Sequence, residues 1–254
     1  MSTRARLALG WALAIAAMLA FAALGRWQLS RMHEKQAMLD RVHAVLATRA
    51  PLALEAAADP ARARDYDWAA GDGRFADAPP VLLDNQSRDE RPGVRAYRLF
   101  QPERGPALLV ELGWLPLPGD RRMPGVPALP GRQRIAGLLL PPPSHGLAAA
   151  VAEAQADGTI VATSLDAAGL ARLLGRRTLP ARQLRLDPAI RIGYPRDLDV
   201  MPNTLPPQRH LGYAVQWFAL SAAVLATALV LTLRRRRPPP DSPASRTRPP
   251  STDA

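Results

Sequence analysis

The feature that most constrains this chain is an uncharged apolar segment that runs from Leu211 to Leu233. Four arginines, Arg234–Arg237, follow it directly. A helix of about 23 residues, rising about 1.5 Å per residue, is roughly 35 Å long and can cross a hydrocarbon layer of about 30 Å. The segment therefore predicts a transmembrane helix over residues 211–233.

A second uncharged segment runs from Leu7 to Leu24. Within it, Ala20-Phe21-Ala22 fits the small-x-small cleavage pattern of a signal peptide. However, the segment exceeds the roughly 7 to 15 apolar residues usual for a signal peptide, and it continues into a helical pattern. We therefore expect an uncleaved transmembrane helix over residues 7–24.

Basic residues lie at the outer ends of both segments. Arg4 and Arg6 precede the first, and the four arginines follow the second. The positive-inside rule places residues 1–6 and 234–254 in the cytoplasm and the middle of the chain outside. The sequence thus predicts a multi-pass protein of the cell inner (plasma) membrane, embedded in the lipid bilayer, with a periplasmic main domain.

The formal net charge of +11 does not indicate a nucleic-acid partner. More than half of it, +6, lies at the two ends of the chain, before the first apolar segment and after the second, and +5 is spread over Arg26 to Arg209 among many acidic residues. This is a mixed surface rather than a basic stripe, so we expect no nucleic-acid binding. The chain has no cysteine, which excludes disulfides, thiolate metal sites and cysteine nucleophiles.

Between the two segments the pattern changes twice. Residues 25–50 predict a juxtamembrane amphipathic helix, in which apolar residues recur near helical spacing. Residues 51–210 predict a mainly antiparallel β domain and a return segment, because short apolar or alternating stretches are separated by Gly, Pro and Asp. The expected strands lie at Tyr66–Phe75, Pro80–Asn85, Val94–Gln101, Ala107–Trp114, Arg134–Leu140, Thr159–Ser164 and Gln183–Asp187.

Two further segments complete the expected architecture. Asp166 is positioned to cap a short helix over Ala167–Leu174, with Gly175 just after its end. The tail, residues 234–254, is basic and rich in Pro, Ser and Thr, which is typical of a disordered extension. The expected fold class is an α+β membrane protein, with two transmembrane helices flanking an extracytoplasmic, mainly antiparallel β domain.

The sequence carries no enzyme signature. It lacks a G-x-G-x-x-G after a strand, a P-loop, H-E-x-x-H and G-x-S-x-G. Among the four histidines, His210 is the candidate for chemistry, since it opens the second apolar segment with Tyr213 and Trp217 three and seven residues later. Trp217 lies too deep for an interfacial aromatic, so it is expected to pack against the first helix or a flat ligand.

Trp27, Gln28 and Arg31 leave the first apolar segment at the same depth. If the two helices pair, these residues meet His210 at the outer leaflet. A neutral imidazole binds iron, aromatic rings flank a flat ring, and arginines pair with carboxylates, so haem is the candidate ligand. Aromatics and arginines also populate ordinary membrane interfaces, and spacing alone leaves that interpretation open.

Four motifs of the sequence resemble those of the Surfeit locus protein 1 family, the cytochrome c oxidase assembly factors. The first resembles the family's L-G-x-W-Q-L-x-R-x-x-x-K and the last its H-x-x-Y-A-x-x-W-F. They occur in the family's order, and the resemblance covers Leu7 to Leu233. The four motifs are Leu24–Arg31 with Lys35, Val81–Asn85, Val110–Pro116 and His210–Phe218.

The resemblance implies a function without enzyme activity. Family members are thought to hold haem a as a transient cargo and to present it to subunit I of cytochrome c oxidase, together with other oxidase assembly factors. The iron ligand then falls on His210. The other expected contacts of the haem are Trp27, Gln28, Arg31, Arg209, Tyr213 and Trp217.

Two departures from the family pattern accompany the resemblance. Leu112, preceded by Glu111, stands where the family has Arg before Gly-Trp. Arg209 precedes the histidine where the family tends to have Asn, and its guanidinium could pair with a propionate. Two other functions stay open: a scaffold that stabilises nascent subunit I without binding haem, and a periplasmic hydrolase, for which the sequence shows no nucleophile–base pair.

Overall fold

The computed structural model describes residues 2–142, 151–200 and 205–236. The chain divides into two compact units: Met1–Glu34 together with Pro207–Ala254, and Lys35–Pro206. The tail expected to be disordered, residues 234–254, lies outside the described residues from residue 237 onward.

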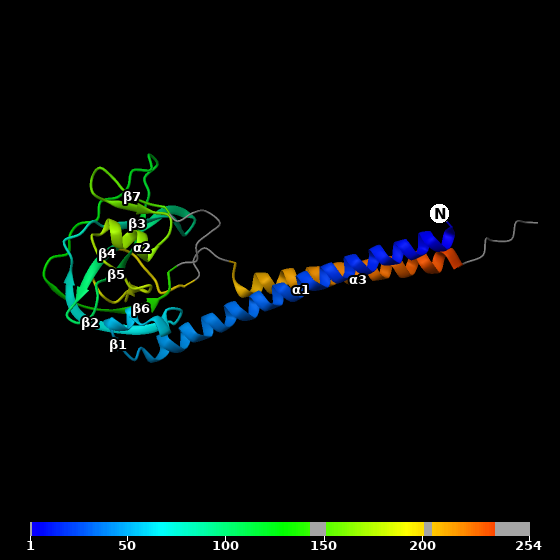
Figure 1. Ribbon diagram of the computed structural model, residues 1–254, viewed down its shortest axis with the longest axis horizontal. Helices are drawn as coiled ribbons and strands as arrows, with labels where there is room; N and C mark the ends of the chain where they lie inside the picture. The colour runs from blue at the N-terminus through cyan, green and yellow to red at the C-terminus, as the bar shows by residue number, and fades with distance from the viewer. Residues whose placement is uncertain (1, 143–150, 201–204, 237–254) are drawn as a thin grey trace, which may run out of the picture. The chain divides into compact units, whose positions relative to one another are not determined.

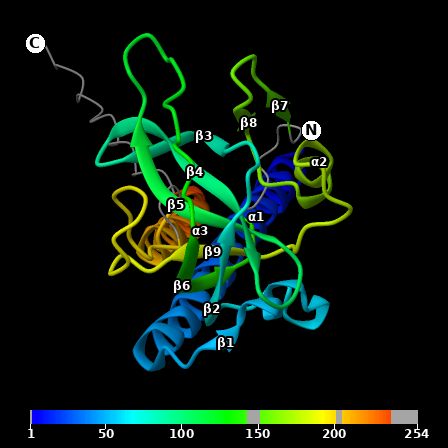
Figure 2. The same ribbon diagram turned by 90° about the vertical axis from the view of Figure 1, so that its left-hand side faces the viewer.

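The first unit is a pair of long helices that lie side by side (Figures 1 and 2). They are α1 (Thr3–Thr48) and α3 (Pro207–Arg236). Both contain a stretch long and apolar enough to cross a membrane. The segment expected at residues 7–24 and all but the last two residues of the segment expected at 25–50 form one continuous helix, and residues 35–48 of α1 belong to the second unit.

Small residues and polar contacts join α1 to α3. The indole Nε1 of Trp11 donates to Thr232 Oγ1 at 3.1 Å, and Ser221 Oγ donates to the backbone oxygen of Met18 at 3.2 Å. A Cβ added to Gly25 would lie 2.8 Å from the ring of Phe218, so a larger residue there would require the ring to move. Close approach at small residues and interhelical hydrogen bonds are the usual means of pairing helices in lipid.

The second unit is built on a sheet that has nine strands within the described residues. Each of the seven expected strand segments contains a strand, while β1 and β7 were not expected. The strands are β1 (Leu52–Ala53), β2 (Asp67–Phe75), β3 (Val81–Arg88), β4 (Arg91–Pro102), β5 (Leu108–Pro116), β6 (Arg132–Leu140), β7 (Ala152–Ala154), β8 (Ile160–Ala162) and β9 (Gln183–Leu186).

Short helices complete this unit. Two 3-10 turns, η1 (Leu54–Ala58) and η2 (Pro60–Arg62), follow β1. The expected capped helix is confirmed as α2 (Ala167–Leu173), whose first turn is held by Asp166, because its carboxylate accepts the Gly169 N–H at 2.7 Å.

The expectation of a mainly antiparallel domain is wrong, because the sheet is mixed. β1 pairs parallel with β2, β8 parallel with β3, and β9 parallel with β5. β8 and β9 each lie far along the chain from their parallel partners, β3 and β5, and a separation of that length allows a parallel return. An alternating pattern of apolar residues is the same for both strand directions, so the sequence did not reveal this.

Five of the strands close into a small barrel (Figure 2). The order β2-β6-β9-β5-β4 returns to its start because β4 also pairs with β2, with Phe100 opposite Phe75. Leu108, Val110 and Leu112 of β5 belong to the apolar cluster that fills the barrel. Leu109 and Glu111 alternate with them and therefore face outward.

Two apolar clusters cover the outside of the barrel. α2 packs with Leu170 over Tyr97 and Leu109. The last turns of α1 place Val42 against Trp68 of β2 and Leu138 of β6. The outer face of β5 and β9 that carries Glu111 is instead approached by the chain after Asp187, which forms the wall of a polar pocket.

Candidate functional site

His210 lies in the contact between α1 and α3 and is 8 % exposed. Its Nδ1 lies 2.7 Å from Oε1 of Gln28 on α1. Since an amide oxygen only accepts, the imidazole donates from Nδ1, and a neutral ring then carries its lone pair on Nε2. Histidines that bind a metal through one ring nitrogen usually donate the N–H of the other nitrogen to an oxygen, as Nδ1 of His210 does here. His210 and Gln28 therefore fit an iron-bearing group.

Trp217 contacts the first helix. Its indole stacks on the ring of Phe21, with 5.6 Å between ring centroids and 27° between planes. Ala214, one turn after His210, is also buried. His210, Ala214 and Trp217 thus form one face of α3 against α1, and of the two partners expected for Trp217 the structure places the first helix there.

The other expected haem contacts are not brought to His210. Trp27 is 55 % exposed and Tyr213 39 % exposed, and Arg209 is exposed as well. Arg31 forms an ion pair at 2.7 Å with Glu34, one turn along α1. Within this helix pair, the structure therefore joins Gln28 to His210, while the remaining side chains are exposed or paired with another residue.

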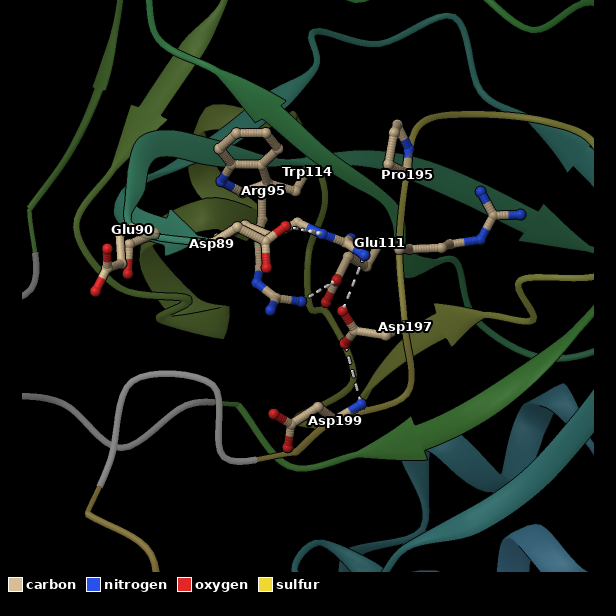
Figure 3. Close-up of a pocket in the computed structure, with 11 residues that line it drawn as sticks. Asp89, Glu90, Arg95, Glu111, Trp114, Pro195, Asp197 and Asp199 are labelled. Carbon is tan, nitrogen blue, oxygen red and sulfur yellow. Dashed lines mark hydrogen bonds and ion pairs between the residues drawn. The ribbon is translucent and has the colours of Figure 1, made fainter.

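Sequence reasoning missed a second site, a polar pocket in the sheet unit (Figure 3). Its volume is about 400 Å³. Figure 3 shows Arg95 reaching toward Glu111, with Asp89 and Glu90 on one side and Asp197 and Asp199 on the other. It is lined by Ser87, Arg88, Asp89, Glu90, Arg95, Glu111, Trp114, Pro195, Arg196, Asp197 and Asp199.

The floor of the pocket is a buried charge cluster. The carboxylate of Glu111, fully buried, accepts hydrogen bonds from Nη1 of Arg95, from Nε of Arg185 at 3.0 Å and from the hydroxyl of Tyr97 at 3.2 Å. Burial raises the pKa of Tyr97 well above its ordinary value, and the charge of Glu111 adds to this, so the phenol stays a donor.

Arg185 stays charged in the same cluster. Burial, the largest single effect, lowers the pKa of Arg185, but the charge and hydrogen bond of Glu111, with the contributions of Tyr97 and Asp197, together outweigh burial and the net direction is upward. Two guanidinium groups, of Arg95 and Arg185, therefore share one carboxylate, and the cluster carries an excess of positive charge.

The backbone positions the walls. Asp89 and Glu90 both have positive φ angles, 50° and 61°, as a two-residue hairpin turn between β3 and β4 requires. Gly113 has a φ of +129°, and the Tyr194 N–H donates to Leu112 O at 2.8 Å beside it. The hairpin turn carries the first wall, and the hydrogen bond of Tyr194 holds the second wall beside β5.

Arg196 fixes the second wall. Its guanidinium is partly buried and donates only to backbone oxygens in the contacts of the described residues, so it ties the return segment to β5 and β9. The accepting oxygens are those of Leu112, Leu186, Asp187, Ile190, Ile192 and Tyr194.

One sequence signal could have pointed to the pocket. Glu111 interrupts an otherwise apolar strand, and a charged residue inside such a strand needs a partner. Its partners lie 16 and 74 residues away along the chain, where spacing gives no guide. Among the described residues, no group of three or more His, Asp or Glu side chains is arranged to hold a metal ion.

Comparison with known proteins identifies one family. A family model described as SURF1 family matches residues 15–222. This range includes Gln28, His210 and Trp217 as well as the whole sheet. No curated protein matches the chain.

Proposed function

Because this chain belongs to the SURF1 family, which is associated with cytochrome c oxidase assembly, we propose that it binds haem a and assists its insertion into subunit I of the oxidase. The observation that carries the proposal is the hydrogen bond from His210 Nδ1 to Gln28 Oε1. It orients the imidazole and fixes Nε2 as the nitrogen with the lone pair.

In this proposal His210 is the iron ligand and Gln28 holds its ring. Haem supplies the iron that accepts the lone pair, and a single imidazole ligand allows the cargo to leave for a stronger site. Trp27 and Tyr213 are exposed aromatic rings that can lie against a flat ligand, while Trp217 holds the helices together. Arg209 is exposed and can pair with a propionate of the haem. Arg31 would have to break its ion pair with Glu34 before it could pair with a propionate.

The proposal extends to location and partners. The two membrane-spanning candidates flank the sheet unit, and the basic residues at their outer ends favour cytoplasmic termini and a periplasmic domain in the inner membrane. The partners are subunit I and other oxidase assembly factors. No catalytic group is required, because the iron chemistry belongs to the receiving oxidase.

The test is the visible spectrum of protein purified from cells that make haem a. We expect a Soret band in the wild type that His210→Ala abolishes. Gln28→Leu should weaken haem binding roughly 10- to 100-fold, the usual effect of removing the partner that orients a metal-bound histidine. His33→Ala, which removes an exposed histidine of α1, is the matched control and should keep the band.

A scaffold that stabilises nascent subunit I without haem is the second candidate. It is favoured by one observation: the stack of Trp217 on Phe21 and the Gln28 contact of His210 already hold the helix pair together. A colourless wild type that still restores oxidase assembly in a deletion strain would support the scaffold and reject haem binding. A Soret band retained in His210→Ala would reject His210 as the ligand.

A further inference from the structure

Two buried N–H groups in the polar pocket have no acceptor among the described residues. They are Nε of Arg95 and Nε1 of Trp114. Arg95 is 8 % exposed, and its guanidinium uses Nη1 for Glu111. Buried donors without acceptors are unfavourable and rare in folded proteins, and both side chains line the pocket, so an oxygen of a water or of a ligand bound there can complete them.

The net charge of the pocket floor determines whether a charged or a neutral ligand oxygen is favoured there. Arg95 and Arg185 carry two positive charges against the single carboxylate of Glu111. A guanidinium edge beside an indole N–H is suited to a carboxylate, which accepts two hydrogen bonds on its two oxygens. The floor therefore favours an anionic group over a neutral carbonyl.

The rim has the opposite sign. Asp89, Glu90 and Asp197 line the pocket, and Arg88 is the cation placed among them, at 3.4 Å from Asp197. These carboxylates repel a polyanion such as a phosphate ester and attract a cationic group on the ligand. A ligand that satisfies both floor and rim carries a carboxylate and a cation a few ångströms apart.

We propose that this pocket binds a carboxylate beside an ammonium or guanidinium group, with the carboxylate on Arg95 and Trp114 and the cationic group between the rim carboxylates. The volume of about 400 Å³ lies at the small end of ligand pockets and suits an amino acid or one or two side chains. The same chemistry is presented by a free amino acid and by neighbouring acidic and basic residues of a partner polypeptide. The proposal is independent of haem binding.

The test follows the indole N–H signal of Trp114 by NMR, in full-length protein in detergent micelles. Trp114→Phe assigns that signal among the five tryptophans. The free probe is L-arginine, and agmatine, which is arginine without its carboxylate, is its control. The peptide probe is acetyl-Lys-Asp-Lys-amide, with acetyl-Lys-Asn-Lys-amide as its control.

We expect L-arginine or the aspartate peptide to shift the Trp114 signal, and the matching control to bind at least tenfold more weakly. Binding by arginine assigns a free amino acid, and binding by the peptide alone assigns a partner segment. Equal binding of a probe and its control, or no binding of either probe, overturns the proposal.

Substitutions test where the carboxylate and the cationic group of the ligand bind. Arg95→Gln should weaken binding of the probe at least tenfold, because it removes the guanidinium from the floor and leaves Glu111 paired with Arg185. Glu90→Gln should weaken it a few-fold, and Arg134→Gln, an arginine outside the pocket, should have no effect. If Arg95→Gln unfolds, the probe-against-control comparison in the wild type still decides. Unchanged binding in folded Arg95→Gln overturns the proposal.

Discussion

Asp67 shows how single residues hold the sheet unit together. Its carboxylate accepts from Nε of Arg62 at 3.0 Å and from Nη1 of Arg182 at 2.6 Å. Burial raises the pKa of Asp67, but the hydrogen bonds and charges of the two arginines outweigh burial and hold it below the ordinary value of 3.8. The ionised carboxylate therefore stabilises the folded state.

This shift gives stability a defined pH dependence. The contribution of Asp67 is present when the pH lies well above the ordinary pKa of 3.8, and it is lost progressively as the pH falls past that value and through the lower folded-state pKa. We expect the denaturant concentration at the unfolding midpoint to decrease as the pH is lowered from about 5 to about 3, roughly the interval around the ordinary pKa. The decrease should be smaller in Asp67→Asn. Chemical denaturation in micelles measures both. Equal losses in the two proteins would show that Asp67 does not contribute.

At the residue scale, the sequence predicted His210 as the functional candidate but only part of its surroundings. Helical spacing placed Tyr213 and Trp217 on the face of His210. Positions three and seven residues along a helix are nevertheless rotated by different angles about its axis: Trp217 stacks on Phe21 of α1, whereas Tyr213 is exposed. The contact with Gln28 depends on the register between two helices, which one helix's spacing does not determine.

Among the elements, β5 carries the most demanding backbone. Gly113 has a φ of +129°, and a Cβ added there would lie 2.5 Å from the backbone oxygen of Tyr194. Gly113→Ala should therefore destabilise the sheet unit by about 2 kcal/mol or more and separate the return segment from β5. Thermal unfolding in micelles measures the loss.

The matched control for this substitution is Gly119→Ala. An added Cβ at Gly119 meets no atom within 4 Å, so its unfolding midpoint should stay near that of the wild type. If both variants unfolded alike, strain at Gly113 would not be the cause. A shift of the Trp114 indole signal in Gly113→Ala would show in addition that the pocket wall has moved.

Strands were predictable as elements, and their pairing was not. Alternation of apolar residues located β2 to β6, β8 and β9, because one face of each strand is buried in the barrel or under a helix. The very short β1 and β7 carry too few residues for a pattern. Direction and barrel closure depend on contacts between distant strands, so the mixed sheet could not be inferred from local pattern.

For the whole molecule, the absence of cysteine makes the proposed orientation directly testable. Single cysteines can be placed at Ser2, before α1, and at Thr178, an exposed position of the sheet unit. In spheroplasts, a membrane-impermeant maleimide should label Thr178→Cys, and it should label Ser2→Cys only after lysis. Labelling of Ser2→Cys in sealed spheroplasts would contradict cytoplasmic termini.

The closed barrel also determines when during synthesis this chain can fold. β9 is the wall between β5 and β6, and its partners Val110 and Gly137 leave the ribosome long before Leu184 and Leu186. Pairing over such sequence distances is slow, and until it occurs the edges of β5 and β6 are open to other chains. The barrel therefore closes only when almost the whole unit has been made, shortly before α3 follows, and a nascent chain that stalls before Gln183 has two unprotected strand edges.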